Sequence, residues 1–399
     1  MITWVLSLLV YLITMALGLY IDTKKDSGKK KTCFIIWLFV FLCFGYMTGS
    51  DWRNYEPEYF DSLMLSRYIN EPGFLLIFKF SPIIIPDFWL FLGIVKCIHL
   101  FTLMKLLQLV SEKWISILVL LFPYQVCFML VQNPLRFMMA LTFVYWGVIL
   151  YLRSRIAKYN TKKTMTFVKM TLLFLLASLF HNSCLFMLLT LPVYFYADRF
   201  VNMNRVILFV IYIFIIVITT NVSLINEMIG DLNYSIMGYY SIKDYSETYS
   251  VADSSNIFSI GNILKIVFFL FILLSRDSVY KRKSNRNSYI YGLALSYCYF
   301  DRIFLLIPTG FRLVIPFMNF YIAYFILMLY TERRYAQIFI MYSFLTFANK
   351  LWFSYDLIPY SNSIPYIVTG HKDYYERHLN NVVQYKERTG EEIVLRIDQ

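Results

Sequence analysis

Apolar runs long enough to cross a bilayer recur along this sequence, and they constrain the fold more than any other feature. Each is close to the length of roughly 17–25 residues that an α-helix needs to cross about 30 Å of hydrocarbon. Hydrophobic residues make up 59% of the 399-residue chain, whereas soluble domains have roughly 45–50%. The sequence has no alternating, barrel-like strands, so helices must satisfy the backbone hydrogen bonds within the bilayer. We therefore predict an all-α, polytopic helical membrane protein.

The apolar runs predict about 12 spans, within a range of about 10–13. They are residues 2–20, 33–48, 87–104, 114–131, 136–152, 165–181, 183–197, 206–225, 257–275, 288–304, 312–330 and 336–352. A shorter run, 73–85, contains Lys79 and Pro82 and is predicted to be interfacial or re-entrant. One transmembrane domain, 1–352, would thus carry long loops at 49–86 and 226–256, and a polar tail at 353–399 would follow it. A GT-C-like arrangement is one candidate architecture.

Basic residues predict the orientation of these spans. The chain has a formal net charge of +12, and 21 of its 37 Lys and Arg residues lie in every second loop. These loops are 21–32, 105–113, 153–164, 198–205, 276–287 and 331–335. The positive-inside rule makes them cytoplasmic, so both termini and the remaining loops are predicted to be extracytoplasmic. The basic excess is then a topology signal and a contact with anionic lipid, and it does not indicate nucleic-acid binding.

Polar residues at the predicted outer boundary form the candidate site, although they are spread along the sequence. They are Asp51, Arg53, Arg136, His181 and Arg312. Ionisable groups at membrane boundaries often have a function. Simpler interpretations remain open, because an arginine can extend to the headgroups and Asp51 or His181 can serve a turn. Within the spans, Lys96, Lys169 and Lys265 are predicted to snorkel or to pair between helices. The six cysteines form no CxxC pair and are interpreted as small buried hydrophobic residues.

Several segments together resemble the EpsG family of bacterial exopolysaccharide proteins, which are akin to Wzy-type polymerases. Gly49-Ser50-Asp51-Trp52-Arg53-Asn54-Tyr55 resembles its G-x-D-x-x-N-Y element, and Glu71-Pro72-Gly73-Phe74 resembles its E-P-G-F element. Asn133 to Ala140 resembles N-x-x-R-x-x-x-A, Ala177 to Ser183 resembles A-x-x-F-H-x-S, and Arg312 resembles a late arginine. These elements follow the family order over residues 45–330. Phe137 departs from the glutamine that the family often has there, and the tail contains no recognisable family motif.

The resemblance implies a polymerase of glycan repeat units carried on undecaprenyl pyrophosphate. Transfer would take place at the outer face of the bacterial cytoplasmic (inner) membrane and would yield exopolysaccharide, capsule or O-antigen. A flippase and a chain-length regulator are the implied protein partners, and no cofactor is implied. The sugars and their linkage remain open.

The implied reaction suggests a role for each candidate residue. Pyrophosphate is a good leaving group that needs cations to stabilise its charge, so Arg136, Arg312 and Arg53 are assigned to it. His181 is the first candidate for the base that deprotonates the acceptor, because the ordinary pKa of histidine lies near neutral pH. Asp51 is the alternative base. No D-x-D motif is found, so no essential metal is expected.

Three other functions remain possible from the sequence. A GT-C glycosyltransferase that uses a polyprenyl-phosphate sugar would add one sugar instead of extending a chain. A flippase or transporter would need cations deep in a central cavity, for which Lys96, Lys169 and Lys265 are candidates. A membrane acyltransferase would need an acidic residue close to its histidine, and His181 has none nearby in sequence.

Overall fold

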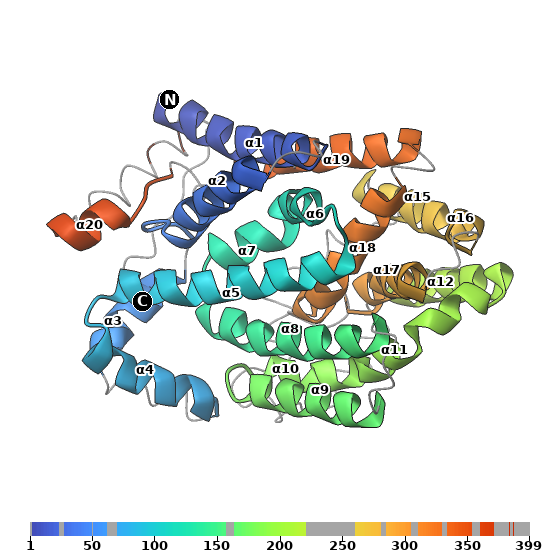
Figure 1. Ribbon diagram of the computed structural model, residues 1–399, viewed down its shortest axis with the longest axis horizontal. Helices are drawn as coiled ribbons and strands as arrows, with labels where there is room; N and C mark the ends of the chain where they lie inside the picture. The colour runs from blue at the N-terminus through green and yellow to red at the C-terminus, as the bar shows by residue number, and fades with distance from the viewer. Residues whose placement is uncertain are drawn as a thin grey trace. The chain divides into compact units, whose positions relative to one another are not determined.

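The structure is a computed structural model, and its described part is all-helical (Figure 1). It describes residues 2–23, 28–49, 51–61, 70–156, 163–220, 260–280, 285–304, 310–328, 333–352 and 360–370, together with residues 383 and 386. The only pairing of strand type in these residues is an isolated bridge between Gly45 and Asn362. The predicted all-α fold class is therefore confirmed for this part of the chain. The predicted loop 226–256 and most of the tail lie outside it.

Each of the twelve predicted runs coincides with a helix or a short series of helical segments. The elements are α1 (Ile2–Thr23), α2 (Gly28–Leu38), η1 (Phe39–Cys43), α5 (Phe88–Val110), α6 (Trp114–Leu120), η3 (Phe122–Val126), α7 (Cys127–Leu130), α8 (Leu135–Ile156), α9 (Lys163–Ser178), α10 (Ser183–Phe186), η4 (Met187–Thr190), α11 (Leu191–Tyr196), η5 (Ala197–Asn202), α12 (Arg205–Thr220), α15 (Ile260–Leu274), α17 (Asn285–Ile303), α18 (Phe311–Met328) and α19 (Arg333–Trp352). A short helix, α16 (Arg276–Tyr280), lies in the predicted loop 276–287. Among the described residues, five helical stretches are long and apolar enough to cross a membrane: Val5–Thr23, Phe88–Val110, Leu135–Arg155, Ser183–Asn202 and Phe311–Met328. The total of about 12 spans remains a prediction.

The predicted loop 49–86 contains two helices, α3 (Trp52–Phe60) and α4 (Pro72–Ile84). Pro72 opens α4, where its missing N–H costs no helical hydrogen bond. With 13 residues at 1.5 Å each, α4 is about 20 Å long, shorter than the hydrocarbon core. This length fits the predicted interfacial or re-entrant segment. A further short helix, α20 (Ile364–Thr369), lies in the predicted tail.

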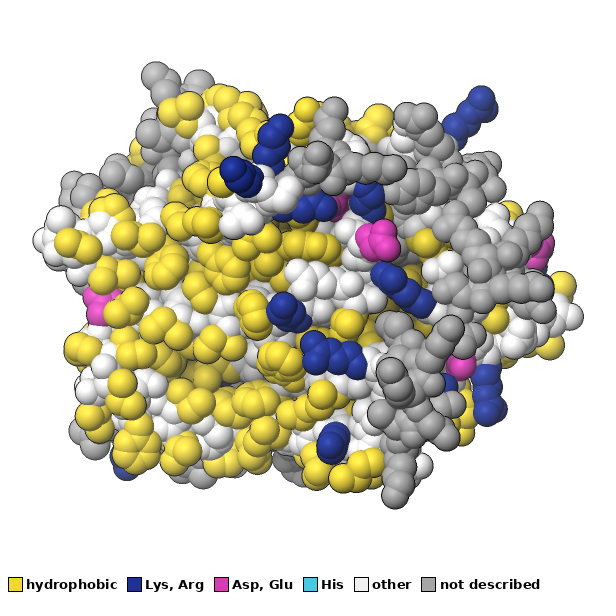
Figure 2. All heavy atoms as spheres, in the orientation of Figure 1, with side chains coloured by type: hydrophobic (Ala, Val, Ile, Leu, Met, Phe, Trp, Pro, Cys, Tyr) yellow, Lys and Arg dark blue, Asp and Glu magenta, His cyan; other side chains and the backbone are white. Residues whose placement is uncertain are grey.

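Large hydrophobic side chains are exposed on several helices, and Figure 2 shows a face that they largely cover. On α12, Val206 is 66% exposed, Val210 58% and Phe214 63%. Residues four positions apart share one face of a helix, so these side chains form an apolar stripe. Apolar surface of this extent is unfavourable in water and suits contact with lipid.

The chain forms two compact units. Unit 1 comprises Met1–Ile149, Leu176–His181 and Glu332–Gln399, and unit 2 comprises Leu150–Leu175 and Asn182–Thr331.

Unit 1 has two chemically different ends, which α5 connects. At the last residues of α1, Asp22 binds Lys31 at 3.5 Å and accepts the backbone N–H of Ser116 at 2.7 Å, and Lys113 donates to its carbonyl. At the first turn of α5, Trp89 packs against Trp52 with ring centroids 5.3 Å apart. The 23 residues of α5 separate these ends by about 35 Å. Residues of two loops that the charge pattern predicts to be cytoplasmic therefore lie together at one end, and the Gly49–Tyr55 segment lies at the other.

Both the start of α1 and the segment after α19 lie at the Trp52 end of unit 1. The backbone N–H of Tyr360 donates to Ser7 Oγ at 2.9 Å. Ser363 N donates to the carbonyl of Phe44 at 2.6 Å, and Tyr46 N donates to the carbonyl of Ser361 at 2.8 Å. These backbone bonds attach the C-terminal segment to the turn that precedes Gly49.

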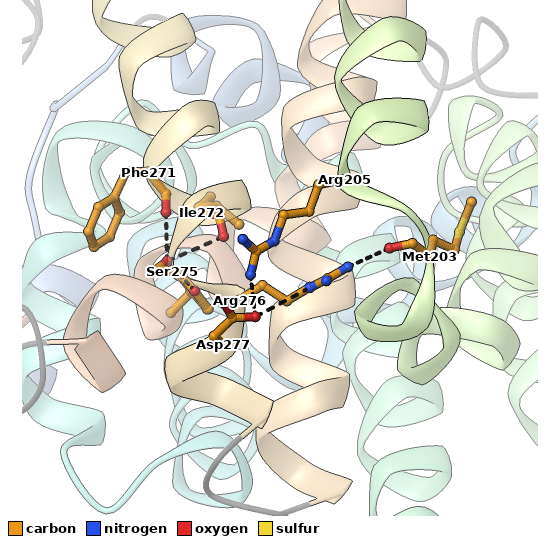
Figure 3. A network of polar contacts seen from close by, with 8 residues as sticks. Met203, Arg205, Phe271, Ile272, Ser275, Arg276 and Asp277 are labelled. Atoms are coloured by element: carbon orange, nitrogen blue, oxygen red, sulfur yellow. Dashed lines mark hydrogen bonds and ion pairs between the residues drawn. The ribbon is translucent and has the colours of Figure 1, made fainter.

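In unit 2, three of the predicted cytoplasmic loops come together. Arg205, at the start of α12, is paired with Asp277 of α16, and Arg276 Nη1 donates to the carbonyl of Met203 at 2.5 Å (Figure 3). Arg155, at the end of α8, lies 3.7 Å from Asp198 of η5. Described residues of loops 153–164, 198–205 and 276–287 thus lie together, which is the grouping that the positive-inside rule predicts.

Candidate functional site

Two turns of unit 1, each with a residue in the left-handed region, form the base of the site. Gly49 has a φ of 79° and Asn133 has a φ of 62°, both in the left-handed region. The backbone of Gln132 approaches Gly49 so closely that a Cβ added there would lie 2.5 Å from the Gln132 oxygen. Asn133 Nδ2 donates to the carbonyl of Thr48 at 2.5 Å. The turn before α3 and the turn before α8 therefore pack backbone against backbone.

Helix α3 begins three residues after Gly49 and buries its aromatic face. The carbonyl of Asp51 accepts the backbone N–H groups of Asn54 and Tyr55, at 3.1 and 3.3 Å. Trp52 Nε1 donates to the carbonyl of Gly49 at 3.0 Å. Trp52 and Tyr55 are both buried, because positions three apart face the same side of a helix. Arg53 lies in α3, but its side chain is outside the part of the chain that the structure describes.

Arg136 is the centre of the polar contacts. It lies in the first turn of α8, where Nη1 binds Glu71 Oε2 at 2.7 Å and Nε donates to the Tyr55 hydroxyl at 3.2 Å. The side chain of Glu71 is only 6% exposed, whereas that of Arg136 is 32% exposed. The guanidinium thus joins α8 to α3 and to the start of α4, while the Arg136 side chain as a whole stays partly exposed.

The Tyr55 hydroxyl remains protonated at neutral pH. Burial raises the pKa of Tyr55 above its usual value of 10.0, and nearby Asp51 and Glu71 raise it further, while Arg136 lowers it. Burial has the largest effect because it disfavours the charged phenolate. Since the Tyr55 oxygen accepts from Arg136, its own proton is directed elsewhere.

His181 is brought to the site by the start of α4. The carbonyl of Leu179 accepts the backbone N–H groups of Gly73 and Phe74, at 2.9 and 3.3 Å. A Cβ on Gly73 would meet Leu179 at 3.0 Å, so the close approach favours glycine. His181 is buried, and its ring meets that of Phe137 edge to face with centroids 5.4 Å apart. Phe137 therefore has a packing role against the histidine.

Three of the five predicted site residues thus surround one hydrogen-bonded assembly in unit 1: Asp51, Arg136 and His181. Arg312 lies in the first turn of α18, in unit 2. Sequence reasoning did not assign Tyr55 and Glu71 to the site. The available signal was their place in the G-x-D-x-x-N-Y and E-P-G-F elements, but spacing alone gives no indication that both contact Arg136.

The lysines within the predicted spans have other environments. Lys96 is fully buried in α5 and its Nζ has no hydrogen-bond partner among the described residues, so the prediction that it snorkels or pairs between helices is wrong. Lys169 is exposed on α9. Lys265 of α15 binds Asp301 of α17 at 2.8 Å, so it is interhelical. Neighbouring Arg302 donates to Asn262 Oδ1 at 2.7 Å. Of the three lysines that the flippase alternative would place in a central cavity, only Lys96 is buried.

The comparisons with known proteins agree with the sequence elements. The sequence model of the EpsG family matches residues 30–367, well over half of the chain. The matched region includes every element of the assembly around Arg136 and extends into α20. Neither a curated protein nor a solved structure matches the chain. Within the described residues, no group of three or more His, Cys, Asp or Glu side chains is placed to hold a metal ion. The chain therefore belongs to the EpsG family, a family of Wzy-like polysaccharide polymerases.

Proposed function

We propose that this protein joins oligosaccharide repeat units carried on undecaprenyl pyrophosphate into exopolysaccharide, capsule or O-antigen. The reaction takes place at the outer face of the bacterial cytoplasmic membrane. Family membership supplies the polymerase class. The observation that carries the finer proposal is the partly exposed side chain of Arg136, which lies at the end of unit 1 away from Lys31 and Lys113.

The proposed reaction transfers the growing glycan from one lipid carrier to a new repeat unit. The bond between the anomeric carbon and the pyrophosphate oxygen breaks, and a glycosidic bond forms to a hydroxyl oxygen of the acceptor. The pyrophosphate gains negative charge as it leaves, and the hydroxyl loses a proton. A planar guanidinium fits phosphate oxygens through two parallel hydrogen bonds, so Arg136 is proposed to bind the leaving group, with Arg312 and Arg53 as further ligands. No metal is required in this scheme.

His181 is the proposed base for the acceptor proton, with Asp51 as the alternative. His181 is close to Arg136 through its ring contact with Phe137, the next residue along the chain. Asp51 is near enough to Tyr55 to affect its pKa. In either case the proton moves from the acceptor hydroxyl to the imidazole nitrogen or to the carboxylate. General bases of this kind typically contribute about 10²–10⁴-fold to a rate.

The proposed outer location of the site leads to a prediction for accessibility. Thr369 follows the segment that packs at the Trp52 end, whereas Lys29 lies near the Asp22 end, and both side chains are exposed. In a cysteine-free background, an impermeant maleimide is expected to label Thr369→Cys in intact cells and Lys29→Cys only after permeabilisation. The reverse pattern would place the site on the cytoplasmic side and contradict the proposal.

Product size tests the polymerase proposal. Purified full-length protein in liposomes, given one lipid-linked repeat unit, is expected to form a ladder of products separated by one repeat, with or without a chelator. Addition of one sugar would indicate the GT-C alternative, and movement of the lipid-linked unit across the bilayer without polymer would indicate a flippase.

The same assay identifies the base. The rate of repeat-unit addition is expected to fall about 10²-fold or more in His181→Ala, and less in Asp51→Asn. A larger loss in Asp51→Asn would assign the base to Asp51.

A further inference from the structure

Arg136 already has an anionic partner in the protein, and this partner is held rigidly. The Glu71 carboxylate lies 2.7 Å from Arg136 Nη1 and is almost fully enclosed. Its backbone is fixed by the helix that follows, because the carbonyl of Glu71 accepts the N–H of Leu75 at 3.0 Å and the N–H groups of Gly73 and Phe74 donate to the carbonyl of Leu179. Glu71 therefore cannot easily move away when another anion approaches the guanidinium.

We propose that Glu71 competes with the lipid pyrophosphate for Arg136 and so promotes release of the carrier after each transfer. This inference rests on the proposed function, since it presumes that Arg136 binds pyrophosphate. Glu71 acts through Arg136 and does not touch the reacting atoms, so it is a positioning residue.

The charges around Arg136 explain why such competition is useful. A polymerase must discharge a spent lipid pyrophosphate in every cycle, and the spent carrier has more negative charge than the glycosylated one. An arginine without a counter-ion would bind this product most tightly of all. Because Glu71 accepts a hydrogen bond from Arg136, a bound phosphate oxygen must compete with this carboxylate for the N–H donors of the guanidinium. Asp51, which is also near Tyr55, adds a second negative charge to the environment of Arg136. Both acids therefore weaken binding of the product.

The same contacts also limit the direction from which the pyrophosphate reaches Arg136. The Nε edge is turned toward the Tyr55 hydroxyl at 3.2 Å, and Nη1 is turned toward Glu71. A ligand that binds Arg136 must therefore approach a guanidinium whose Nε and Nη1 already have partners in the protein. Tyr55 and Glu71 thus together position the Arg136 side chain. Of these two residues, only Glu71 has a negative charge that competes with the ligand.

Glu71→Gln distinguishes competition for Arg136 from a merely structural role. Competition predicts tighter binding of pyrophosphate in the variant, whereas a structural role predicts unchanged or weaker binding. In purified full-length protein, titration with inorganic pyrophosphate is expected to show about tenfold tighter binding in Glu71→Gln, equivalent to about 1.4 kcal/mol. A parallel titration with undecaprenyl pyrophosphate in nanodiscs tests whether the lipid form shows the same change. The first transfer is expected to proceed at the wild-type rate or faster, while multiple-turnover polymerisation slows several-fold.

The matched control is Glu56→Gln, the same substitution on α3. Glu56 accepts from Trp89 Nε1 at 2.8 Å, and a glutamine oxygen can accept this bond, so affinity and turnover should stay at wild-type values. Should Glu71→Gln fail to fold, Glu71→Asp keeps the charge on a shorter side chain, and its affinity should lie between wild type and tenfold tighter. Unchanged or weaker binding of both pyrophosphates in the folded Glu71 variant overturns the inference. Unchanged binding and polymerisation in Arg136→Gln would instead overturn the proposed function itself.

Discussion

Replacing Arg136 with alanine is expected to abolish polymer formation, with a loss of about 10³-fold or more in the rate of transfer. Removal of one donor that stabilises developing negative charge typically costs about 10²–10³-fold, and loss of an arginine that acts on a phosphoryl group costs about 10³–10⁵-fold. Arg136 combines both roles in the proposed site. The measurement is the initial rate of repeat-unit addition by purified protein, together with polymer length in cells.

The alanine variant also leaves a buried carboxylate without its partner, so its effect on folding has to be separated from its effect on chemistry. Glu71 is 5% exposed, and breaking a buried pair at one side destabilises a protein by about 3–5 kcal/mol. The exposed part of Arg136 reduces this figure through solvent screening. The double variant Arg136→Ala/Glu71→Gln removes the buried charge as well, so protein levels should recover while activity stays lost.

Arg136→Lys is the conservative control for the same site. Lysine keeps the charge but cannot bind Glu71, Tyr55 and a phosphate group at once, since it lacks the planar fork. Activity is therefore expected to fall by about tenfold or more while expression stays normal. Wild-type polymer length in Arg136→Ala cells with normal protein levels would contradict the role that we assign to this residue.

The fold was predictable from the sequence to the extent that it depends on local apolar length. The runs at 87–104 and 312–330 are uniformly hydrophobic, and α5 and α18 follow them closely. The run at 114–131 is also a single apolar stretch, yet the structure divides it into α6, η3 and α7. Pro123 lies at the break, where it lacks an N–H donor and its ring clashes with the preceding turn. The apolar residues of segment 49–86 are too few for a span, so the sequence predicts a loop there. Short helices such as α3 and α4 need far fewer apolar residues than a membrane span does, so a search for spans does not find them.

The candidate site shows a different limit. Asp51, Arg136 and His181 were identified because charged and polar side chains at span ends are conspicuous against an apolar background. Glu71 and Tyr55 have no such contrast, since they lie in a polar and aromatic segment of the chain. Their contacts with Arg136 join positions 65 and 81 residues apart, and such pairing depends on how helices pack, which a single sequence does not specify. The carboxylate that neutralises the key arginine could therefore be found only in the structure.

Gly49→Ala is expected to be the most disruptive single-methyl change at the site. The φ of Gly49 is 79°, and a residue with a Cβ is strained there by about 1–2 kcal/mol. The added Cβ would also lie 2.5 Å from the oxygen of Gln132 and closer still to its Cα, and backbone atoms cannot move aside as a flexible side chain can. We expect a total destabilisation of about 3 kcal/mol or more.

Gly49→Ala is also expected to reduce polymerisation, because Gly49 lies where the turn before α3 packs against the turn before α8. Separation of Gly49 from Gln132 would shift the start of α3 relative to the start of α8, and so Tyr55 relative to Arg136. Displacements of about 1 Å in a site can cost about 10²-fold in rate. Both the thermal unfolding midpoint and polymerisation should therefore decrease in Gly49→Ala. In Gly28→Ala, where a Cβ meets nothing within 4 Å, neither should decrease. If Gly49→Ala retains the wild-type midpoint and rate, the two turns do not pack as closely as described, and the backbone contact cannot be what aligns Tyr55 with Arg136.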